Sequence, residues 1–468
     1  MRHFKILATT LGAALLVAAC GGGGDGNQAP KIAFSSMVTF GDSLSDVGSY
    51  AVGDVLAAGG GKFTVNGITV DTIANPASKN WTERIAAQLQ LPAPCAAETG
   101  LAGTGFVSKV GAAIIGPIAA VFHSGCFNYA QGGSRVTLPV GPSNIANVSD
   151  PVSVAIGELT VPVVDQIAKH LSVVGGSFSG TELVTVMAGA NDVLQLLDEL
   201  TLAATAAGTA AGNTAFAQSL IGQLAAGATN PATAAQAIGL AFQTTAASGA
   251  DMTTIVGATV YAAATQAGNS AVGSPAVYGP MVATAQAAGA TAGAAAGATY
   301  AGTTGATAAV TAMGTAGAQL AGLINTQIVG KGAKYVAVVN LPDVSLSPGS
   351  VAKGPAIQGL IHTMVTTFNA QMKAGLATTA NVIQVDAFAN IADEVANPAA
   401  YGLTNVTSPA CDMTKTALVS SMLCTKDTLM PGDVSHYLFI ESGGHPTPFA
   451  LKLLAQVVAR DMIVAGWL

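Results

Sequence analysis

Short apolar runs alternate along the chain with segments of helical periodicity. The apolar or β-branched runs are Met37 to Phe40, Leu183 to Met187 and Tyr335 to Asn340. The segments with apolar residues at helical spacing are Trp81 to Leu89, Val161 to Leu171 and Phe368 to Leu376. Strands separated by helices predict an α/β fold in which helices cover both faces of a mostly parallel central sheet. Ligands of such folds bind at the carboxyl ends of the strands.

One long segment interrupts this alternation. Between Thr201 and Gly330, Ala, Gly and Thr dominate and Asp251 is the only charged residue. Alanine favours helix, Gly and Thr weaken it, and small side chains bury little area per residue. We predict a helical insertion at about residues 201 to 315, followed by a helix over Thr315 to Val329 that leads into the third strand. The insertion is either a lid over a binding site or a low-complexity expansion away from the chemistry.

The composition limits the partners that the chain can bind. Half of its 468 residues are hydrophobic, which is enough for a large core. Only 9% are charged and the net charge is −7. A weakly acidic chain has no electrostatic means of capturing an anionic polymer, so we expect no nucleic-acid partner.

The amino-terminal residues have the pattern of an export signal. A short basic stretch precedes the apolar run Ile6 to Ala19, and Leu16 to Cys20 resembles a bacterial lipobox. This resemblance implies a signal peptide over residues 1 to 19, lipidation of the Cys20 thiol, and a flexible tether over residues 20 to 35. A glycine follows the cysteine, which favours an exported lipoprotein anchored in the outer membrane. An ordinary cleaved signal or a short anchor helix is the alternative.

The other four cysteines are Cys95, Cys126, Cys411 and Cys424. An even number in an exported chain fits two disulfides. Sequence proximity favours Cys95 with Cys126 and Cys411 with Cys424 among the three possible pairings. None of them has the spacing of a zinc site, and we expect neither a metal nor a cofactor.

A serine follows the first apolar run. Ser43 stands in a turn of small residues, Phe40 to Gly48, where its hydroxyl can be exposed. A serine hydroxyl is a poor nucleophile at neutral pH, so it needs a base within hydrogen-bond reach and donors for the oxyanion that its attack creates. The chain lacks the G-x-S-x-G elbow of α/β-hydrolases, and these groups must come from another arrangement.

Four separated blocks supply such groups. They are Gly41 to Ser45 (GDSLS), Asn128 to Gly133 (NYAQGG), Gly189 to Asp192 (GAND) and His445 to Thr447 (HPT). In this order they resemble the GDSL, or SGNH, family of serine esterases and lipases. The resemblance implies a flavodoxin-like three-layer α/β/α sandwich with Ser43 as nucleophile and His445 as general base. It also implies an oxyanion hole formed by the Ser43 and Gly133 backbone N–H groups and the Asn191 side-chain amide.

The resemblance covers residues 36 to 468, except the insertion. Asn340 to Pro342, Phe368 to Ala370 and the stretch from Asn397 to Cys411 are similar to segments of the secreted bacterial lipase and phospholipase branch. We therefore expect one hydrolase domain over residues 36 to 468.

The family completes its catalytic triad of serine and histidine with an acid, and this chain matches that acid less directly. The family has an Asp three residues before the histidine, where this chain has a serine, and Glu441 lies one residue further back. One extra residue in the turn, at Gly443 and Gly444, would give Glu441 the role of that acid. Asp433 and His436 form a literal D-x-x-H and are the competing pair. We predict His445 with Glu441, and Asp433 is the alternative acid.

The resemblance implies hydrolysis of carboxylic esters through an acyl-enzyme at Ser43, with an ester or lipid as the substrate. Acyl transfer to another alcohol and hydrolysis of carbohydrate or aryl esters use the same machinery. A lipoprotein that binds envelope lipid or glycan without catalysis is an alternative of another class. Catalysis requires Ser43, Gly133, Asn191 and His445 to converge in the folded chain.

Overall fold

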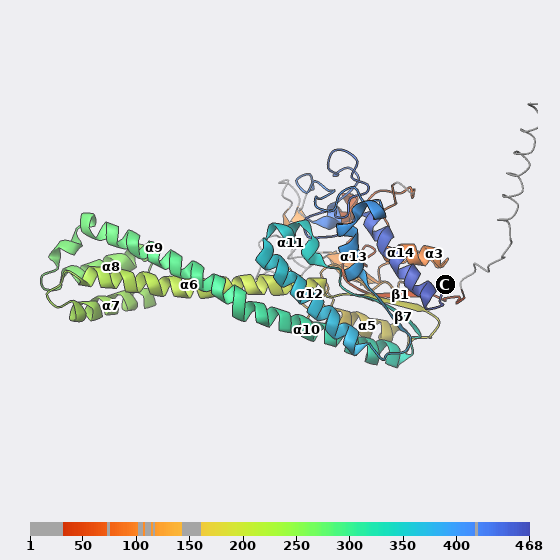
Figure 1. The fold of residues 1–468 in the computed structure, drawn as a ribbon, viewed down its shortest axis with the longest axis horizontal. Helices are drawn as coiled ribbons and strands as arrows, with labels where there is room; N and C mark the ends of the chain where they lie inside the picture. The colour runs from red at the N-terminus through yellow and green to blue at the C-terminus, as the bar shows by residue number, and fades with distance from the viewer. Residues whose placement is uncertain are drawn as a thin grey trace, which may run out of the picture.

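The computed structural model describes residues 31 to 468 except 73–74, 102–105, 108–113, 116–117, 143–160 and 417–419. The expected signal peptide, Cys20 and most of the expected tether lie outside the described residues. Figure 1 shows two parts, a rounded α/β body and a long helical projection. We call residues 201 to 305 the stalk and the remaining described residues the body.

The body is built on a parallel sheet of four strands. Across the sheet they are β1 (Met37–Gly41), β6 (Leu183–Met187), β7 (Tyr335–Val339) and β8 (Val382–Val385), and each neighbouring pair is parallel. Thr39, on the outer edge of β1, exchanges backbone hydrogen bonds with Phe127 and Tyr129. The second sequence block therefore lies beside the strand that precedes Ser43. The three predicted strands are confirmed, and β8 is an additional one.

Helices cover both faces of the sheet. Val184 and Val186 of β6 pack into one core and Leu183 and Met187 of the same strand into the other, because successive side chains point to opposite faces. The helices of the first core are α5 (Val163–Val173), α10 (Ala306–Leu323) and α12 (Pro355–Gly375), and those of the second are α3 (Trp81–Gln88) and α14 (Pro448–Val464). The predicted α/β/α layering is confirmed.

Shorter elements complete the body. They are α2 (Gly53–Ala57), α11 (Pro348–Ala352), α13 (Ala387–Ala396), the antiparallel pair β2 (Glu98–Leu101) and β5 (Ile118–Phe122), and the antiparallel pair β3 (Phe106–Val107) and β4 (Ile114–Ile115). Two disulfides join Cys95 to Cys126 and Cys411 to Cys424, as sequence proximity predicted. Disulfides persist in oxidising compartments, which agrees with an exported protein.

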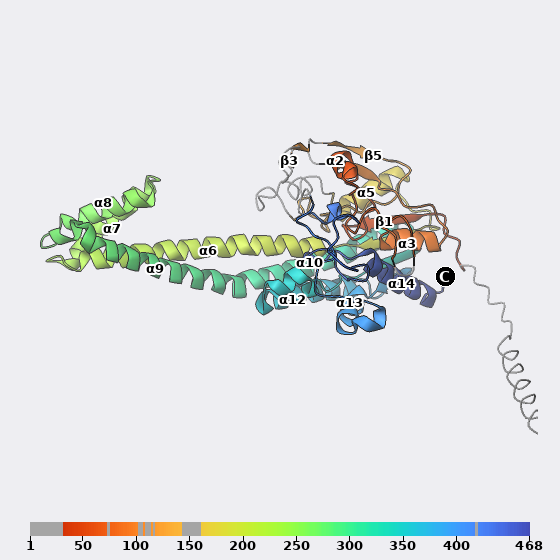
Figure 2. The ribbon, with the colours of Figure 1, turned by 90° about the horizontal axis from the view of Figure 1, so that it is seen from above.

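The insertion is helical, as predicted, and longer than a compact hairpin. Its helices are α6 (Ala190–Ala225), α7 (Pro231–Ala247), α8 (Met252–Ala264) and α9 (Pro275–Tyr300). The 36 residues of α6 span about 54 Å. Figures 1 and 2 show α6 and α9 side by side from the body outward, with α7 and α8 at the far end. The helix α6 begins inside the third sequence block, before the predicted start of the insertion.

Glycines allow α6 and α9 to touch along their backbones. A Cβ on Gly208 would lie 2.8 Å from the carbonyl oxygen of Gly293, and one on Gly212 would lie 2.9 Å from that of Gly289. Larger side chains return at the far end, where Phe216, Leu220, Leu224, Ile238 and Val260 form a separate core. The stalk thus has a glycine contact in its shaft and a small apolar core at its tip.

One helical run in the described residues, Pro275–Lys331, is long and apolar enough to cross a membrane by length and composition. Buried core helices meet the same criterion, and part of this run lies inside the molecule. Ala, Gly and Thr give little insertion energy compared with Leu or Ile. We therefore treat the run as part of the stalk and of the body core.

Candidate active site

Ser43 lies in the turn that directly follows β1. The Gln166 side chain holds the end of that strand: Gly41 N–H donates to Gln166 Oε1 at 2.9 Å, and Gln166 Nε2 donates to the Gly41 carbonyl at 2.9 Å. A Cβ at Gly41 would lie 2.2 Å from the carbonyl oxygen of Met187 on β6. The partly exposed Ser43 is thereby fixed at the carboxyl edge of the sheet, where parallel sheets place their ligands.

Three of the predicted residues meet there. His445 Nε2 lies 2.8 Å from Ser43 Oγ, although 402 positions separate the two residues. On the other side of the ring, His445 Nδ1 lies 2.9 Å from Glu441 Oε1. The same carboxylate oxygen accepts the His445 backbone N–H at 3.0 Å. An imidazole held between a hydroxyl and a carboxylate is the geometry of a serine triad.

The turn between Glu441 and His445 depends on its two glycines. A Cβ on Gly443 would lie 2.8 Å from Glu441 Oε2, which accepts the Gly443 N–H. Gly444 has a φ of +103°, in the region that favours glycine. The extra residue in this turn is therefore absorbed by the backbone, and the longer Glu side chain still reaches the imidazole.

The competing pair has other partners. Asp433 Oδ1 accepts the backbone N–H of Ser435 at 3.0 Å and its hydroxyl at 2.6 Å. His436 Nδ1 lies 2.8 Å from the Gly402 carbonyl oxygen, and its ring stacks on Phe449 at 4.1 Å. The structure places neither residue against Ser43.

Two carboxyl groups near the imidazole differ in their electrostatics. Burial raises the pKa of Glu441, but the His445 side chain and the backbone N–H groups of the turn outweigh it, and the net pKa is lowered. Burial raises the pKa of Asp42 to about 7. Asp42 Oδ1 accepts the Leu44 N–H at 3.1 Å, whereas Oδ2 has no hydrogen-bond partner among the described residues. Glu441 is thus the carboxylate that remains ionised beside the imidazole.

The loop that carries Gly133 is held from both sides. The N–H of Gly132 donates to Asp46 Oδ2 at 2.9 Å, and its carbonyl accepts the Tyr50 hydroxyl at 2.6 Å. Gly133 follows with a φ of +87°, which favours glycine, and is more exposed than its neighbours. In the described part of the chain, neither the Gly133 N–H nor the Ser43 N–H donates to another residue. Both donors are available to a ligand oxygen.

Asn191 lies in the first turn of α6, the helix that becomes the stalk. It is buried, and it lines the same cavity as Ser43 and His445. Its Nδ2 donates one hydrogen bond to the Ser134 carbonyl at 2.9 Å. An amide nitrogen carries two N–H donors, so one remains while the other fixes the side chain next to the Gly133 loop.

A buried ion pair joins the Gly133 loop to α6. Arg135 Nε lies 2.9 Å from Asp192 Oδ1, and Asp192 Oδ2 accepts the Val136 N–H at 3.1 Å. Burial raises the pKa of Asp192, and Arg135 opposes that shift. Breaking a buried pair leaves an uncompensated charge, so this contact holds the Gly133 loop and the start of α6 firmly together.

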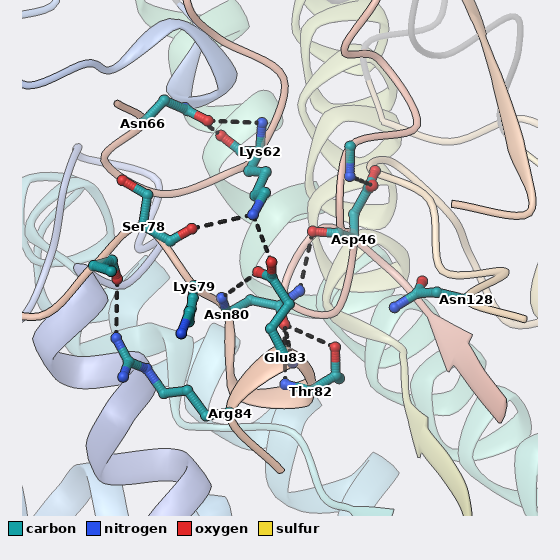
Figure 3. Close-up of polar contacts among 12 residues, drawn as sticks. Asp46, Lys62, Asn66, Ser78, Lys79, Asn80, Thr82, Glu83, Arg84 and Asn128 are labelled. Atoms are coloured by element: carbon teal, nitrogen blue, oxygen red, sulfur yellow. Dashed lines mark hydrogen bonds and ion pairs between the residues drawn. The ribbon is translucent and has the colours of Figure 1, made fainter. Parts of the chain in front are cut away.

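Further buried hydrogen bonds hold the turn that carries Ser43. Asp46 Oδ1 accepts the N–H groups of Gly48 and Ser49, each at 2.8 Å. Figure 3 shows the start of α3 next to this turn, where the Asn80 side chain donates to the Asp46 carbonyl at 3.0 Å. Asn128, also in Figure 3, donates through Nδ2 to the Ser45 carbonyl at 2.9 Å. The turn is thus tied both to α3 and to the second sequence block.

Two residues that contact the imidazole were not found from the sequence. The ring of Phe63 stacks on that of His445, with centroids 5.3 Å apart. Ser421 Oγ lies 3.1 Å from His445 Nδ1. The Cys411–Cys424 disulfide closes the loop that carries Ser421. Neither residue belongs to a sequence block; the predicted disulfide was the only signal near Ser421.

A cavity of about 290 Å³ opens beside Ser43 and His445. Leu44, Val193 and Leu197 are among its apolar lining residues. It is thus suited to an apolar group next to the serine. Within the described residues, no group of three or more His, Cys, Asp or Glu side chains is arranged to hold a metal ion.

Comparison with known proteins gives a partial match to one enzyme family. The chain is 23% identical over 145 residues to a GDSL esterase/lipase of Arabidopsis thaliana, covering 29% of this chain and 38% of that protein. It is 28% identical over 148 residues to the anther-specific proline-rich protein APG of the same plant, covering 29% of this chain and 27% of that protein. No family model matches the chain. The match supports a relationship to the GDSL esterases and lipases and, in general terms, a hydrolase of the esterase type.

Proposed function

We propose that the protein hydrolyses carboxylic esters through an acyl-enzyme at Ser43. The observation that carries this proposal is the pair of contacts on one imidazole, 2.8 Å from Ser43 Oγ and 2.9 Å from Glu441 Oε1. This arrangement activates a serine, because the imidazole accepts its proton while the carboxylate stabilises the resulting cation.

The residues divide the reaction as follows. His445 Nε2 takes the Ser43 proton as Oγ attacks the ester carbonyl, and the carbonyl oxygen becomes an oxyanion. The N–H groups of Ser43 and Gly133 and the second N–H of Asn191 donate to that oxyanion. His445 then protonates the departing alkoxide, which leaves as an alcohol. Finally His445 removes a proton from water, which attacks the acyl-enzyme and releases the acid and free Ser43.

The apolar cavity supports a lipase, esterase or phospholipase type of substrate, because an apolar acyl group fits beside Leu44, Val193 and Leu197. Transfer of the acyl group to another alcohol would use the same first half-reaction. The ratio of acid to transferred product in the presence of added alcohols separates the two outcomes.

The test is labelling by a fluorophosphonate probe together with hydrolysis of p-nitrophenyl acetate. We expect wild-type protein and Ser435→Ala to be labelled and active, because Ser435 contacts Asp433 outside the site. Ser43→Ala should lose the label, and its turnover should fall by roughly six orders of magnitude. A folded Ser43→Ala protein with wild-type turnover would overturn the proposed function.

A further inference from the structure

A groove continues from the catalytic cavity onto the stalk. The cavity of about 290 Å³ beside Ser43 and a second one of about 620 Å³ between α6 and α9 share Leu197 and Lys353 as lining residues. The second cavity follows α6 as far as Thr209 and reaches α9 at Gly293. Between Leu197 and Thr209 the helix rises about 18 Å. The two cavities therefore adjoin at Leu197 and Lys353, and together they define a groove that begins beside Ser43 and ends on the stalk.

The lining of the stalk part of this groove is apolar. Leu197, Leu200 and Ile357 contribute the larger side chains, and alanines and glycines of both helices form much of the rest. The two threonines nearest the body use their hydroxyl protons within the helix: Thr201 Oγ1 donates to the Leu197 carbonyl and Thr205 Oγ1 to the Thr201 carbonyl, each at 2.8 Å. Thr201 and Thr205 therefore offer a ligand no uncommitted hydroxyl proton.

In the stalk part of the groove, charged side chains lie at the junction with the cavity beside Ser43. The charged side chains that line it are those of Asp198 and Lys353. Burial raises the pKa of Asp198, and Lys353 opposes that shift. Beyond this junction the lining residues are Leu, Ile, Ala, Gly and Thr. A ligand that fits must therefore be apolar along its length, with its reactive end at Ser43.

We propose that this groove binds the acyl chain of a long-chain ester, so that the base of the stalk sets the chain-length preference. The inference rests on the proposed function, because continuity with Ser43 identifies the occupant as the acyl group. A hydrocarbon chain leaves water when it enters the groove and requires no hydrogen bond there. The helix α6 thus supplies a binding surface in addition to carrying Asn191.

A series of tryptophans along α6 tests this. Thr201, Thr205 and Thr209 all line the groove and follow one another by four residues, or about 6 Å per step. For each of Thr201→Trp, Thr205→Trp and Thr209→Trp, kcat/KM is measured on p-nitrophenyl acetate, octanoate, laurate and palmitate. We expect the ratio of palmitate to acetate to fall roughly tenfold or more in Thr201→Trp. Each step outward should lengthen the longest chain that is still preferred.

Ala206→Trp is the matched control, because Ala206 is exposed and lies next to Thr205 but outside the groove lining. Its palmitate-to-acetate ratio should equal that of the wild type, and melting followed by circular dichroism checks that all variants are folded. An unchanged ratio in all three groove variants, or an equal loss in Ala206→Trp, would overturn the proposal.

A binding measurement separates the groove from catalysis. The fluorescent fatty acid cis-parinaric acid is titrated into Ser43→Ala protein with and without the Thr201→Trp change. We expect the Kd to rise roughly tenfold with Thr201→Trp and to stay unchanged with Ala206→Trp. Binding with this pattern in a protein that hydrolyses no ester would reject the enzyme and keep the groove. Ester hydrolysis without such binding would keep the enzyme and reject the groove.

Discussion

The body and the stalk are held together by different kinds of contact. In the body, large side chains such as Phe40, Trp81 and Phe368 are fully buried against the two faces of the sheet. In the shaft of the stalk, glycines bring α6 and α9 into backbone contact, as at Gly208 and Gly293. The body is therefore sensitive to lost volume and the shaft to added volume.

One helix belongs to both regions. The first turn of α6 is fixed by the hydrogen bond from Asn191 to Ser134 and by the ion pair between Asp192 and Arg135. The outer part of the helix is held by the glycine contacts with α9 and by the small core at the tip. The candidate site residue of this helix, Asn191, thus lies at the end of α6 that the body holds in place. Changes to the outer stalk should leave the reaction of short esters intact, whereas changes to the body residues around Ser43 and His445 should not.

After the loss expected for Ser43→Ala, the largest effect also lies in the body. Glu441→Gln keeps the side-chain shape but removes the charge that stabilises the protonated His445, so kcat on p-nitrophenyl acetate should fall by about three to four orders of magnitude. Asp433→Asn is the control and should keep wild-type turnover, since Asp433 contacts Ser435 instead. The opposite pattern, with loss only in Asp433→Asn, would assign the acid to Asp433.

A smaller expected effect is a difference between the two regions in how the unfolding free energy depends on pH. The Asp42 pKa is raised by burial from 3.8 to about 7, so the folded state keeps a proton that the unfolded state has lost. Stability from this group is complete below the unfolded pKa and is lost as the pH rises through the folded one. Asp42→Asn cannot ionise, and near pH 8 it should be more stable than the wild type by about 4 kcal/mol.

The measurement is the unfolding free energy from denaturant titration of both proteins between about pH 4 and 8. The two curves should converge toward the acidic end. Intrinsic fluorescence follows the body, because Trp81 and Trp467 both lie there. A variant whose gain is the same at every pH would contradict the raised pKa of Asp42. The stalk, with Asp251 as its one charged residue, should show little dependence on pH.

The smallest effect lies in the shaft. Gly293→Ala adds a Cβ 2.8 Å from the Gly208 carbonyl oxygen, so the helices must move apart, at a cost of about 1 kcal/mol after the gain in helix propensity. A Cβ on Gly222, in the same pair of helices, meets nothing within 4 Å. Gly222→Ala should therefore stabilise the stalk by up to about 1 kcal/mol.

Melting followed by circular dichroism should shift in opposite directions for these two variants, because the stalk contributes much of the helix. Melting followed by tryptophan fluorescence, which reports the body, should shift less. Equal shifts in both signals would mean that body and stalk unfold as one unit.

Much of the body could be predicted from the sequence because its strands are buried on both faces and therefore read as apolar runs. The candidate site residues could be predicted as well, because Ser43, Asn191 and His445 each stand in a short sequence block that lies at the carboxyl edge of the sheet. Contacts such as Phe63 on His445 could not be predicted, since they depend on how distant loops pack. The outer stalk gave no such signal either, because Ala, Gly and Thr repeat there with no apolar period that marks one face.

The chain leaves the body for the stalk and returns to it at neighbouring points. A Cβ on Gly305, at the end of the stalk, would lie 2.2 Å from Leu200 Cδ1 near its start. Because the two attachment points coincide, the body places no requirement on how far the hairpin extends. Matched pairs of helical turns could be added to or removed from the outer stalk by repeat expansion or contraction. The length of the stalk can therefore change between relatives of this chain without altering the contacts around Ser43 and His445.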